Sequence, residues 1–222
     1  MSEKYNAALG AFEQIKNIDG PLDMGIGTGS TTDIFTKEFL PKIRTNIHSL
    51  YSSSIRTTDL LKSLNFTVHK SKPNKILDLY IDGADEVDKD LNLIKGGGGA
   101  HTNEKIIAAS ANYFICIVDS SKLVETLGSF PLPIEVLAKD KENVIQRCQE
   151  YTQKITAREN LSDNGNILID LHEMQIFDPL QIEKEINDIN GVVEVGIFAV
   201  NKPEIVIVGK DDGYNSIESS IA

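Results

Sequence analysis

The stretch ILDLYIDGADE, residues 76–86, decides the fold class of this chain. Its first half is a mainly apolar run of the kind found in strands that are buried on both faces of a sheet. Its second half turns acidic at once, with Asp82 and Asp85 three positions apart. A buried strand that ends in a polar cluster is typical of α/β proteins, in which ligands collect at the carboxyl ends of parallel strands.

The segments on either side alternate between strand-like and helix-like patterns. Strands are predicted over 22–26, 47–52, 76–81 and 114–119, and helices over 3–18, 32–40, 55–64 and 102–113. This alternation predicts a mostly parallel sheet with helices on both faces. Three polar clusters, GTGST (27–31), DGADE (82–86) and DSSK (119–122), each follow a strand-like run. We therefore expect all three to lie on one rim of one sheet.

The sequence changes character at FPLPIEV, residues 130–136, where two prolines fall within three positions. From there the order is strand, helix, strand, turn, strand, helix, strand, with Asn164-Gly165 as a hairpin signal and the last strand over 192–198. This order predicts a small ferredoxin-like α+β domain. We expect a catalytic α/β domain over 1–130, the ferredoxin-like domain inserted at 131–203, and a return to the first sheet over 204–222.

Composition limits the possible classes of function. Of the 222 residues 41% are hydrophobic and 25% are charged, and 33 acids against 22 bases give a formal charge of −11. That charge disfavours binding to nucleic acid or to an anionic membrane. The N-terminus lacks the order of a signal peptide, and no apolar run approaches the roughly 18 residues of a membrane span. With two cysteines and no disulfide framework, a cytoplasmic protein is expected.

Residues 25–31, GIGTGST, are similar to a nucleotide-binding fingerprint but lack its spacing. A GxGxxG motif would need glycine where Ser30 or Thr32 stands, and a P-loop would need Gly-Lys-Ser/Thr. What remains is a glycine turn with free backbone amides and hydroxyls at a helix start, where a phosphate is favoured. A tight strand-to-helix turn with Ser30 or Thr31 as the N-cap accounts for the same residues. The residues alone leave both interpretations open.

The acids that follow residue 81 do not fit a metal site. The run from Asp88 matches the first half of an EF-hand loop, but Leu93 replaces the required glycine and Gly99 the required glutamate. No histidine pair has the spacing of a zinc site. We therefore expect no metal. A bend at the strand end would turn Asp82 and Asp85 into one pocket, and the later acids are expected to form a solvated loop.

The run KGGGGA, residues 95–100, is the most unusual in the chain. Ordering glycine costs roughly 0.5–1 kcal/mol more than ordering alanine, so four in a row need a reason. A flexible linker is one explanation, but the run lies between a strand signal and a helix. A backbone that wraps closely around a small ligand explains it better, and Lys95 would supply a cation for a phosphate or an oxyanion. Spacing alone singles out neither Glu104 nor Lys122.

Together these motifs resemble class A ribose-5-phosphate isomerase. The resemblance spans nearly the whole chain and rests on GIGTGST, DGADEVD (82–88), KGGGGA with TNEK (102–105), DSSK, FPLPIEV, SDNGN (162–166) and GVVEVGIFA (191–199). It implies interconversion of D-ribose 5-phosphate and D-ribulose 5-phosphate in the pentose phosphate pathway, without a metal or an organic cofactor. It also implies a Rossmann-like main domain and a homo-oligomer, either a homodimer or a homotetramer.

The resemblance also implies roles for single residues. Glu104 takes the position of the catalytic base, and Asp82, Asp85 and Lys95 fall on the other active-site charges. As a hypothesis, Glu104 moves a proton between C1 and C2 through an enediolate, and Lys95 stabilises the oxyanion. The aspartates would bind sugar hydroxyls, and one of them would assist ring opening. The substrate-binding positions are Thr28, Gly29, Ser30, Thr31, Asp82, Gly83, Ala84, Asp85, Lys95, Gly96, Gly97, Gly98 and Lys122.

Two features depart from the family pattern, and three other functions compete. His101 stands where an apolar residue is usual, and PLDMGIG (21–27) is more polar than the usual strand. The alternatives are a non-catalytic sugar-phosphate sensor of related fold, an amino-sugar-phosphate deaminase and an acyl-CoA transferase. A sensor would usually carry a DNA-binding segment, a deaminase a catalytic histidine, and a transferase a glutamate nucleophile on another motif. The sequence displays none of these patterns.

Overall fold

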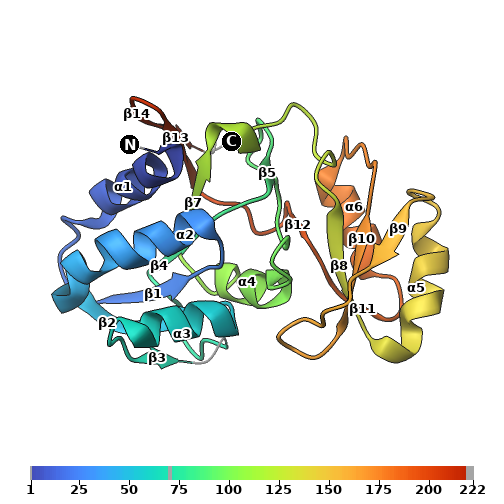
Figure 1. Ribbon diagram of the computed structural model, residues 1–222, viewed down its shortest axis with the longest axis horizontal. Helices are drawn as coiled ribbons and strands as arrows, with labels where there is room; N and C mark the ends of the chain where they lie inside the picture. The colour runs from blue at the N-terminus through green and yellow to red at the C-terminus, as the bar shows by residue number, and fades with distance from the viewer. Residues whose placement is uncertain (1, 70–71, 219–222) are drawn as a thin grey trace. The chain divides into compact units, whose positions relative to one another are not determined.

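The structure, a computed structural model, describes residues 2–69 and 72–218. Residues 1, 70–71 and 219–222, which fall in the predicted domains 1–130 and 204–222, lie outside the described residues. The chain divides into two compact units (Figure 1). The first consists of Met1–Ala84, Asn103–Lys122 and Pro203–Ala222, and the second of Asp85–Thr102 and Leu123–Lys202.

A seven-stranded sheet forms the centre of the first unit, in the order β14-β13-β7-β4-β1-β2-β3. Its neighbours pair in parallel, except for β13 and β14, which pair antiparallel. This confirms the predicted α/β class with a mostly parallel sheet. The strands are β1 (Leu22–Ile26), β2 (Ile47–Ser52), β3 (Val68–His69), β4 (Leu79–Asp82), β7 (Phe114–Asp119), β13 (Ile205–Lys210) and β14 (Gly213–Glu218).

The helices of the first unit begin close to where the sequence places them. The N-caps are side chains for two of them: Ser2 accepts from the Tyr5 N–H and Ser54 from the Thr57 N–H. Among the described residues, no helix is both long and apolar enough to cross a membrane. The helices are α1 (Glu3–Ile15), α2 (Ser30–Ile34), α3 (Ile55–Ser63) and α4 (His101–Ala108), whose first two residues group with the second unit.

Several predicted elements differ in extent from those observed. The helices expected over 3–18 and 102–113 end at Ile15 and Ala108. The helix expected over 32–40 begins earlier and ends as α2 at Ile34, followed by a π-helical turn (Phe35–Phe39) and a 3-10 helix (Leu40–Asn46). Pro41, which cannot donate an amide hydrogen, lies in the first turn of that 3-10 helix. The strand expected over 76–81 begins only at Leu79.

Complete burial of the central strands shows that the sheet is covered on both faces. Every residue of β4 and β7 is buried. The predicted return of the chain to the first sheet is observed, since β13 pairs in parallel with β7 along its length. Helix α1 packs against β13 and β7.

The second unit contains a four-stranded antiparallel sheet in the order β11-β8-β10-β9. Two helices connect its strands in the βαββαβ order expected from the sequence. Figure 1 draws these elements in yellow to orange. They are β8 (Leu132–Val136), α5 (Lys141–Cys148), β9 (Ile155–Ala157), β10 (Ile167–Leu171), α6 (Pro179–Asn187) and β11 (Val192–Val195).

A second, three-stranded sheet in this unit has the order β12-β6-β5, formed by β5 (Glu86–Val87), β6 (Leu93–Ile94) and β12 (Ile197–Phe198). The single strand expected over 192–198 is therefore wrong, because Gly196 divides it between two sheets. A Cβ on Gly196 would lie 2.3 Å from the carbonyl oxygen of Lys95. Residues 85–102 and 123–130, assigned from sequence to the first domain, group with the second unit.

Candidate active site

Three polar segments of the first unit follow parallel neighbouring strands. The GTGST turn follows β1, Asp82 ends β4, and the 3-10 turn Ser120–Lys122 follows β7. Since these strands are parallel and the order is β7-β4-β1, the three segments share one rim, as predicted from the sequence. The chain leaves β1 toward β2 on one side and β4 lies on the other, which is the switch point where α/β sheets bind ligands.

Asp82 holds the glycine turn in place. Its fully buried Oδ1 accepts hydrogen bonds from the backbone N–H groups of Thr28 at 2.9 Å and Gly83 at 2.7 Å. Its Oδ2 accepts a hydrogen bond from the Tyr80 hydroxyl. Gly27 permits this close approach, since a Cβ there would lie 1.8 Å from the Cγ of Asp82. The first predicted aspartate thus binds the turn that the sequence singled out.

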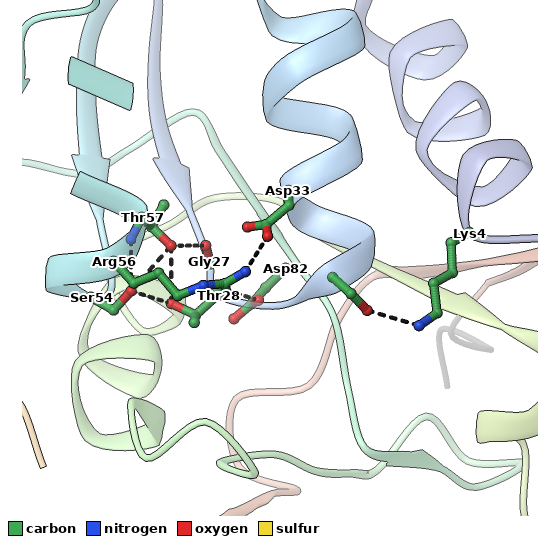
Figure 2. A network of polar contacts seen from close by, with 9 residues as sticks. Lys4, Gly27, Thr28, Asp33, Ser54, Arg56, Thr57 and Asp82 are labelled. Atoms are coloured by element: carbon green, nitrogen blue, oxygen red, sulfur yellow. Dashed lines mark hydrogen bonds and ion pairs between the residues drawn. The ribbon is translucent and has the colours of Figure 1, made fainter. Parts of the chain in front are cut away.

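A cluster of hydroxyls surrounds Thr28 (Figure 2). The Thr28 Oγ1 lies 2.8 Å from the Ser53 Oγ, 2.7 Å from the Ser54 Oγ and 3.2 Å from the Thr57 Oγ1. The Thr57 hydroxyl also donates to the carbonyl oxygen of Gly27 at 2.9 Å. These contacts join the first turn of α3 to the GTGST turn. None of the three partners of Thr28 was among the predicted site residues.

Positive charge reaches the same turn from the flanking helices. Figure 2 shows Lys4 of α1, whose Nζ lies 2.9 Å from the Ser30 Oγ, and Arg56 of α3, which forms an ion pair with Asp33. Lys122 ends the 3-10 turn after β7 and is partly buried. In a chain with a formal charge of −11, this places cations beside backbone amides and hydroxyls.

Glu104 lies in the first turn of α4 and is only 3% exposed. Its charge acts on the buried Tyr80 phenol. Burial raises the pKa of Tyr80 well above its usual value, and the negative charges of Asp82 and Glu104 raise it further. The phenol therefore stays protonated and donates to Asp82. Two buried carboxylates that act on one phenol form the kind of electrostatic environment found at catalytic sites.

In the second unit the glycine run forms a tight turn after β6. The Gly99 N–H donates to the carbonyl oxygen of Gly96 at 2.9 Å. Gly96 has φ +106° and Gly99 has φ +75°, values that residues with a Cβ rarely adopt. The Gly97 N–H donates to the Oδ2 of Asp85 at 2.8 Å, and Gly97 and Gly98 are exposed. The second predicted aspartate thus binds the exposed tip of this loop.

Lys95 and His101 flank the glycine turn, and both are buried. Lys95 is 2% exposed, its N–H donates to the Gly196 carbonyl at 2.8 Å, and its Nζ lies 5.5 Å from the centre of the Phe198 ring. An ammonium group held in a low-dielectric environment exerts a strong field. The His101 ring packs directly on Gly96, where a Cβ would lie 2.6 Å from its Nδ1. A polar ring therefore fills the position where the resemblance of the motifs predicts an apolar residue.

The two units divide the predicted site residues between them. Within residues 2–69 and 72–218, no group of three or more His, Cys, Asp or Glu side chains is placed to hold a metal ion. The first unit contains Thr28, Gly29, Ser30, Thr31, Asp82, Gly83, Ala84, Glu104 and Lys122, and the second contains Asp85, Lys95, Gly96, Gly97 and Gly98.

Sequence reasoning missed several residues that contact the site in the first unit. Ser53 and Ser54 had a visible signal, because SSS (52–54) is a polar cluster directly after a predicted strand. Lys4 and Tyr80 had none, since a lysine in a first helix and a tyrosine in a buried strand are ordinary there. Only the folded chain shows that they reach Ser30 and Asp82.

Comparison with known proteins finds one family. The sequence model described as Ribose 5-phosphate isomerase A (phosphoriboisomerase A) matches residues 49–213. Ribose-5-phosphate isomerase A of Baumannia cicadellinicola subsp. Homalodisca coagulata is 39% identical over 228 residues, covering 100% of this chain and 99% of that protein. The enzyme of the same name from Francisella tularensis subsp. novicida (strain U112) is 43% identical over 205 residues, covering 92% of this chain and 91% of its own.

Solved structures agree with the sequence comparison. Ribose 5 phosphate isomerase A from Neisseria gonorrhoeae superposes with a TM-score of 0.91 at 38% identity, over 98% of this chain and 96% of that one. The enzyme from Methanocaldococcus jannaschii gives a TM-score of 0.88 at 36% identity, over 97% of this chain and 98% of that one. A D-ribose-5-phosphate isomerase in complex with phospho-erythronic acid gives 0.87 at 38%, over 97% of each chain.

Proposed function

Because the chain belongs to the ribose-5-phosphate isomerase A family, we propose that it acts through an enediolate with Glu104 as the base. The chain is an aldose–ketose isomerase that interconverts D-ribose 5-phosphate and D-ribulose 5-phosphate, a reaction of the pentose phosphate pathway. Its curated relatives are named as isomerases, so the non-catalytic sensor has no support from them.

The reaction moves one hydrogen between C2 and C1 of the open-chain sugar. In the direction from ribose, the Glu104 carboxylate takes the proton from C2. The C–H electron pair then forms the C1=C2 double bond, and the aldehyde oxygen becomes negative. The proton on the C2 hydroxyl moves to the C1 oxygen, and Glu104 returns its proton to C1. The products are a C2 ketone and a regenerated carboxylate.

The burial of Glu104 carries this proposal. A carboxylate that is 3% exposed has already lost most of its hydration, so little desolvation remains before it takes a proton from carbon. Its charge acts on the Tyr80 phenol that binds Asp82, which connects it to the end of β4. A glutamate that served only to stabilise the helix dipole would be expected at the surface.

We propose that Lys95 stabilises the negative oxygen of the enediolate and that Asp85 is the main residue that binds the sugar hydroxyls. A buried ammonium is suited to stabilise charge that develops during the reaction. Asp85 is partly exposed, whereas Asp82 is fully buried and accepts hydrogen bonds from Thr28, Gly83 and Tyr80. The proposed role of Asp82 is therefore to fix the GTGST turn, and assistance to ring opening falls to Asp85.

We assign the substrate phosphate to the GTGST turn rather than to the glycine run. The hydroxyls and backbone amides of this turn lie beside Lys4, whose ammonium is 2.9 Å from Ser30, and Lys122 lies on the same rim. A dianion requires such local cations in a chain of charge −11. One relative has a solved structure in complex with phospho-erythronic acid. The planar carboxylate of such a sugar acid resembles an enediolate, which supports the same chemistry here.

Replacement of Glu104 by glutamine tests the base directly. We expect Glu104→Gln to lower kcat by roughly three orders of magnitude or more, with KM within about threefold, because the amide keeps the shape but cannot take a proton. Glu142→Gln is the matched control, since the Glu142 side chain is 88% exposed on α5. Turnover of Glu104→Gln close to that of the control would exclude Glu104 as the base.

We also propose a cytoplasmic homo-oligomer, with a homodimer as the first expectation. The resemblance in the sequence motifs supports the oligomer. Cys116 and Cys148 are buried thiols, which are compatible with a reducing compartment. Light scattering coupled to size-exclusion chromatography would distinguish a monomer of 24.4 kDa from a dimer or a tetramer.

A further inference from the structure

The glycine run needs support from outside itself. Each of its glycines loses roughly 0.5–1 kcal/mol more than alanine on ordering, so the run does not hold one shape unaided. Yet the Gly97 N–H lies at a fixed position on Asp85, and Lys95 and α4 adjoin the two ends of the run. Two side chains of the second unit, Arg158 and Glu135, hold this segment, and the proposed chemistry uses neither.

Arg158 binds the backbone of the glycine turn. Its Nη1 donates to the carbonyl oxygen of Gly96 at 3.0 Å and to that of Gly97 at 3.1 Å. The guanidinium is itself fixed by Asp170, with Nε to Oδ2 at 2.7 Å and Nη2 to Oδ1 at 2.6 Å. Both side chains are mostly buried, at 21% and 14% exposed. A rigid fork held by two bonds to a carboxylate fixes direction as well as distance.

Glu135 binds the other end of the segment. This fully buried carboxylate of β8 accepts a hydrogen bond from the Thr102 hydroxyl at 2.5 Å. Ser162 and Asn166 donate to its Oε1 at 2.9 Å and 2.7 Å, and Asn164 donates at 3.2 Å. Burial acts to raise the pKa of Glu135, but these hydrogen bonds outweigh it and lower the pKa below its usual value.

Three of the donors to Glu135, Ser162, Asn164 and Asn166, belong to the SDNGN motif, to which the proposed reaction gives no role. This motif lies in the loop that connects β9 to β10, and Arg158 stands at the start of that loop, directly after β9. Leu168 of β10 packs against Gly99, where a Cβ would lie 2.7 Å from its Cδ1. One hairpin therefore touches the glycine run directly through Arg158 and Leu168, and through Glu135 it fixes Thr102, two residues before Glu104.

We propose that Arg158 and Glu135 are positioning residues for the isomerase reaction, which hold residues 96–102 in their working conformation from the β9–β10 hairpin. This inference rests on the proposed function of Lys95 and Glu104. Arg158 binds the carbonyl groups of Gly96 and Gly97 and thereby sets the direction in which the adjoining amides point. Glu135 sets the start of α4, the helix that carries Glu104.

The test combines kinetics with amide hydrogen exchange in the full-length protein. For Arg158→Ala we expect kcat to fall by roughly 10–100-fold with KM within about threefold, because a displacement of about 1 Å has that effect on a positioned group. Exchange at the amides of Gly97 to Gly99 should rise at least about tenfold while the amides of β10 stay protected. Added guanidinium should restore part of the lost kcat, which a loss of global stability would not permit.

Arg147→Ala is the matched control, since the Arg147 side chain is 58% exposed on α5. Arg158→Lys keeps the charge without the fork and should recover less than half of the activity. If Arg158→Ala fails to fold, Glu135→Gln provides the second variant, with the same fall in kcat and faster exchange at Thr102. Normal kcat in the variants that fold, or unchanged exchange at residues 97–102, would overturn the proposal.

Failure of this inference differs from failure of the proposed function. If Glu104→Gln stays active, the assignment of the base is wrong, while exchange in the Arg158 variants still reports whether Arg158 holds the loop. A different result is an inactive Glu104→Gln together with an Arg158→Ala variant whose kcat and amide exchange equal those of the Arg147→Ala control. In that case the assignment of Glu104 as the base is kept, and only the positioning role of Arg158 is refuted.

Discussion

Gly27 sets the geometry of the sheet rim at the GTGST turn, because it leaves room for the side chain of Asp82. The Asp82 carboxylate occupies the space that a Cβ of residue 27 would need, and from there it accepts the Thr28 N–H. Gly83, which also donates to Asp82, is different, since the nearest atom to its Cβ position is 3.5 Å away. A side chain at residue 27 is therefore excluded by the Asp82 carboxylate, whereas the space around Gly83 would admit one.

We expect Gly27→Ala to lower the free energy of unfolding by about 1–3 kcal/mol, because a methyl group overlaps a buried, hydrogen-bonded carboxylate. Gly83→Ala is the matched control and should change it by less than about 0.5 kcal/mol, because that methyl group meets only ordinary contacts. Urea unfolding of both variants measures the difference. Equal stabilities would show that Asp82 can move aside and that its position is not set by Gly27.

The candidate site shows which residues a sequence can reveal. Glu104 was assigned by resemblance, because a glutamate in a first helical turn has an ordinary explanation of its own. Asp82 and Asp85 were visible from their place after a strand, but their hydrogen bonds to backbone amides were not. Lys4 is separated from Ser30 by 26 positions, and only the packing of α1 brings them together.

The pairing of β1 with β2 explains the polar character of residues 21–27. Asp23 lies in β1, and its Oδ1 accepts from His48 Nδ1 at 2.8 Å and Ser49 Oγ at 2.5 Å, both in β2, and from Lys75 Nζ at 2.6 Å. Burial acts to raise the pKa of Asp23, but the bonds from Lys75, Ser49 and His48 lower it to about 2. A carboxylate in this strand therefore joins β2 to the loop before β4.

Asp23→Asn tests this ionic contact through its dependence on pH. The pKa of Asp23 falls from 3.8 to about 2 in the folded protein, so its stabilisation is complete above about pH 4 and is lost as the pH falls through about 2. After allowance for solvent screening we expect the variant to be less stable by about 1–2 kcal/mol at pH 7. Thermal unfolding should show that the difference in stability between the variant and the unaltered protein becomes smaller by about pH 2.5. A difference that stays constant with pH would contradict a stabilising role of the ionised Asp23.

Element boundaries failed where the chain changes its pattern of pairing. The segment 192–198 was predicted as one strand, yet the chain divides at Gly196, and β11 and β12 join different sheets. Two-residue strands such as β5 and β6 carry no periodicity that a sequence could show. Longer segments were predicted well, since β1, β2 and β7 begin and end where the sequence places them.

The chain leaves its first sheet and returns to it, and the return completes the core. Residues 205–208 of β13 are at most 1% exposed and lie beside β7. This pairing joins residues about 90 positions apart, so it forms only after a long loop has closed. The assignment of residues 85–102 to the second unit has the same origin, because β6 pairs with the distant β12. A local sequence pattern does not show which distant strands pair with each other, so these pairings could not be predicted from it.

Removal of Pro203–Ala222 should therefore prevent folding of the first unit. Burial of four side chains at roughly 1.5–3 kcal/mol each amounts to roughly 6–12 kcal/mol, which is comparable to the whole stability of a domain. We expect no cooperative thermal transition for the unit that contains β7, and partial recovery when the peptide 203–222 is added. A shortened chain that unfolds cooperatively near the temperature of the full chain would show that β13 is dispensable.

Proton transfer by Glu104 is most directly tested by isomerisation of ribose 5-phosphate in D2O, followed by NMR of the product. The proposed mechanism predicts deuterium at C1 of ribulose 5-phosphate with the unaltered enzyme, because the proton held by the carboxylate exchanges with solvent before it returns to carbon. With Glu104→Gln it predicts that product formation and exchange at C2 both slow by roughly three orders of magnitude or more. Product formed without deuterium at C1, as a direct hydride shift would give, would contradict the mechanism. So would exchange at C2 by Glu104→Gln at the rate of the unaltered enzyme.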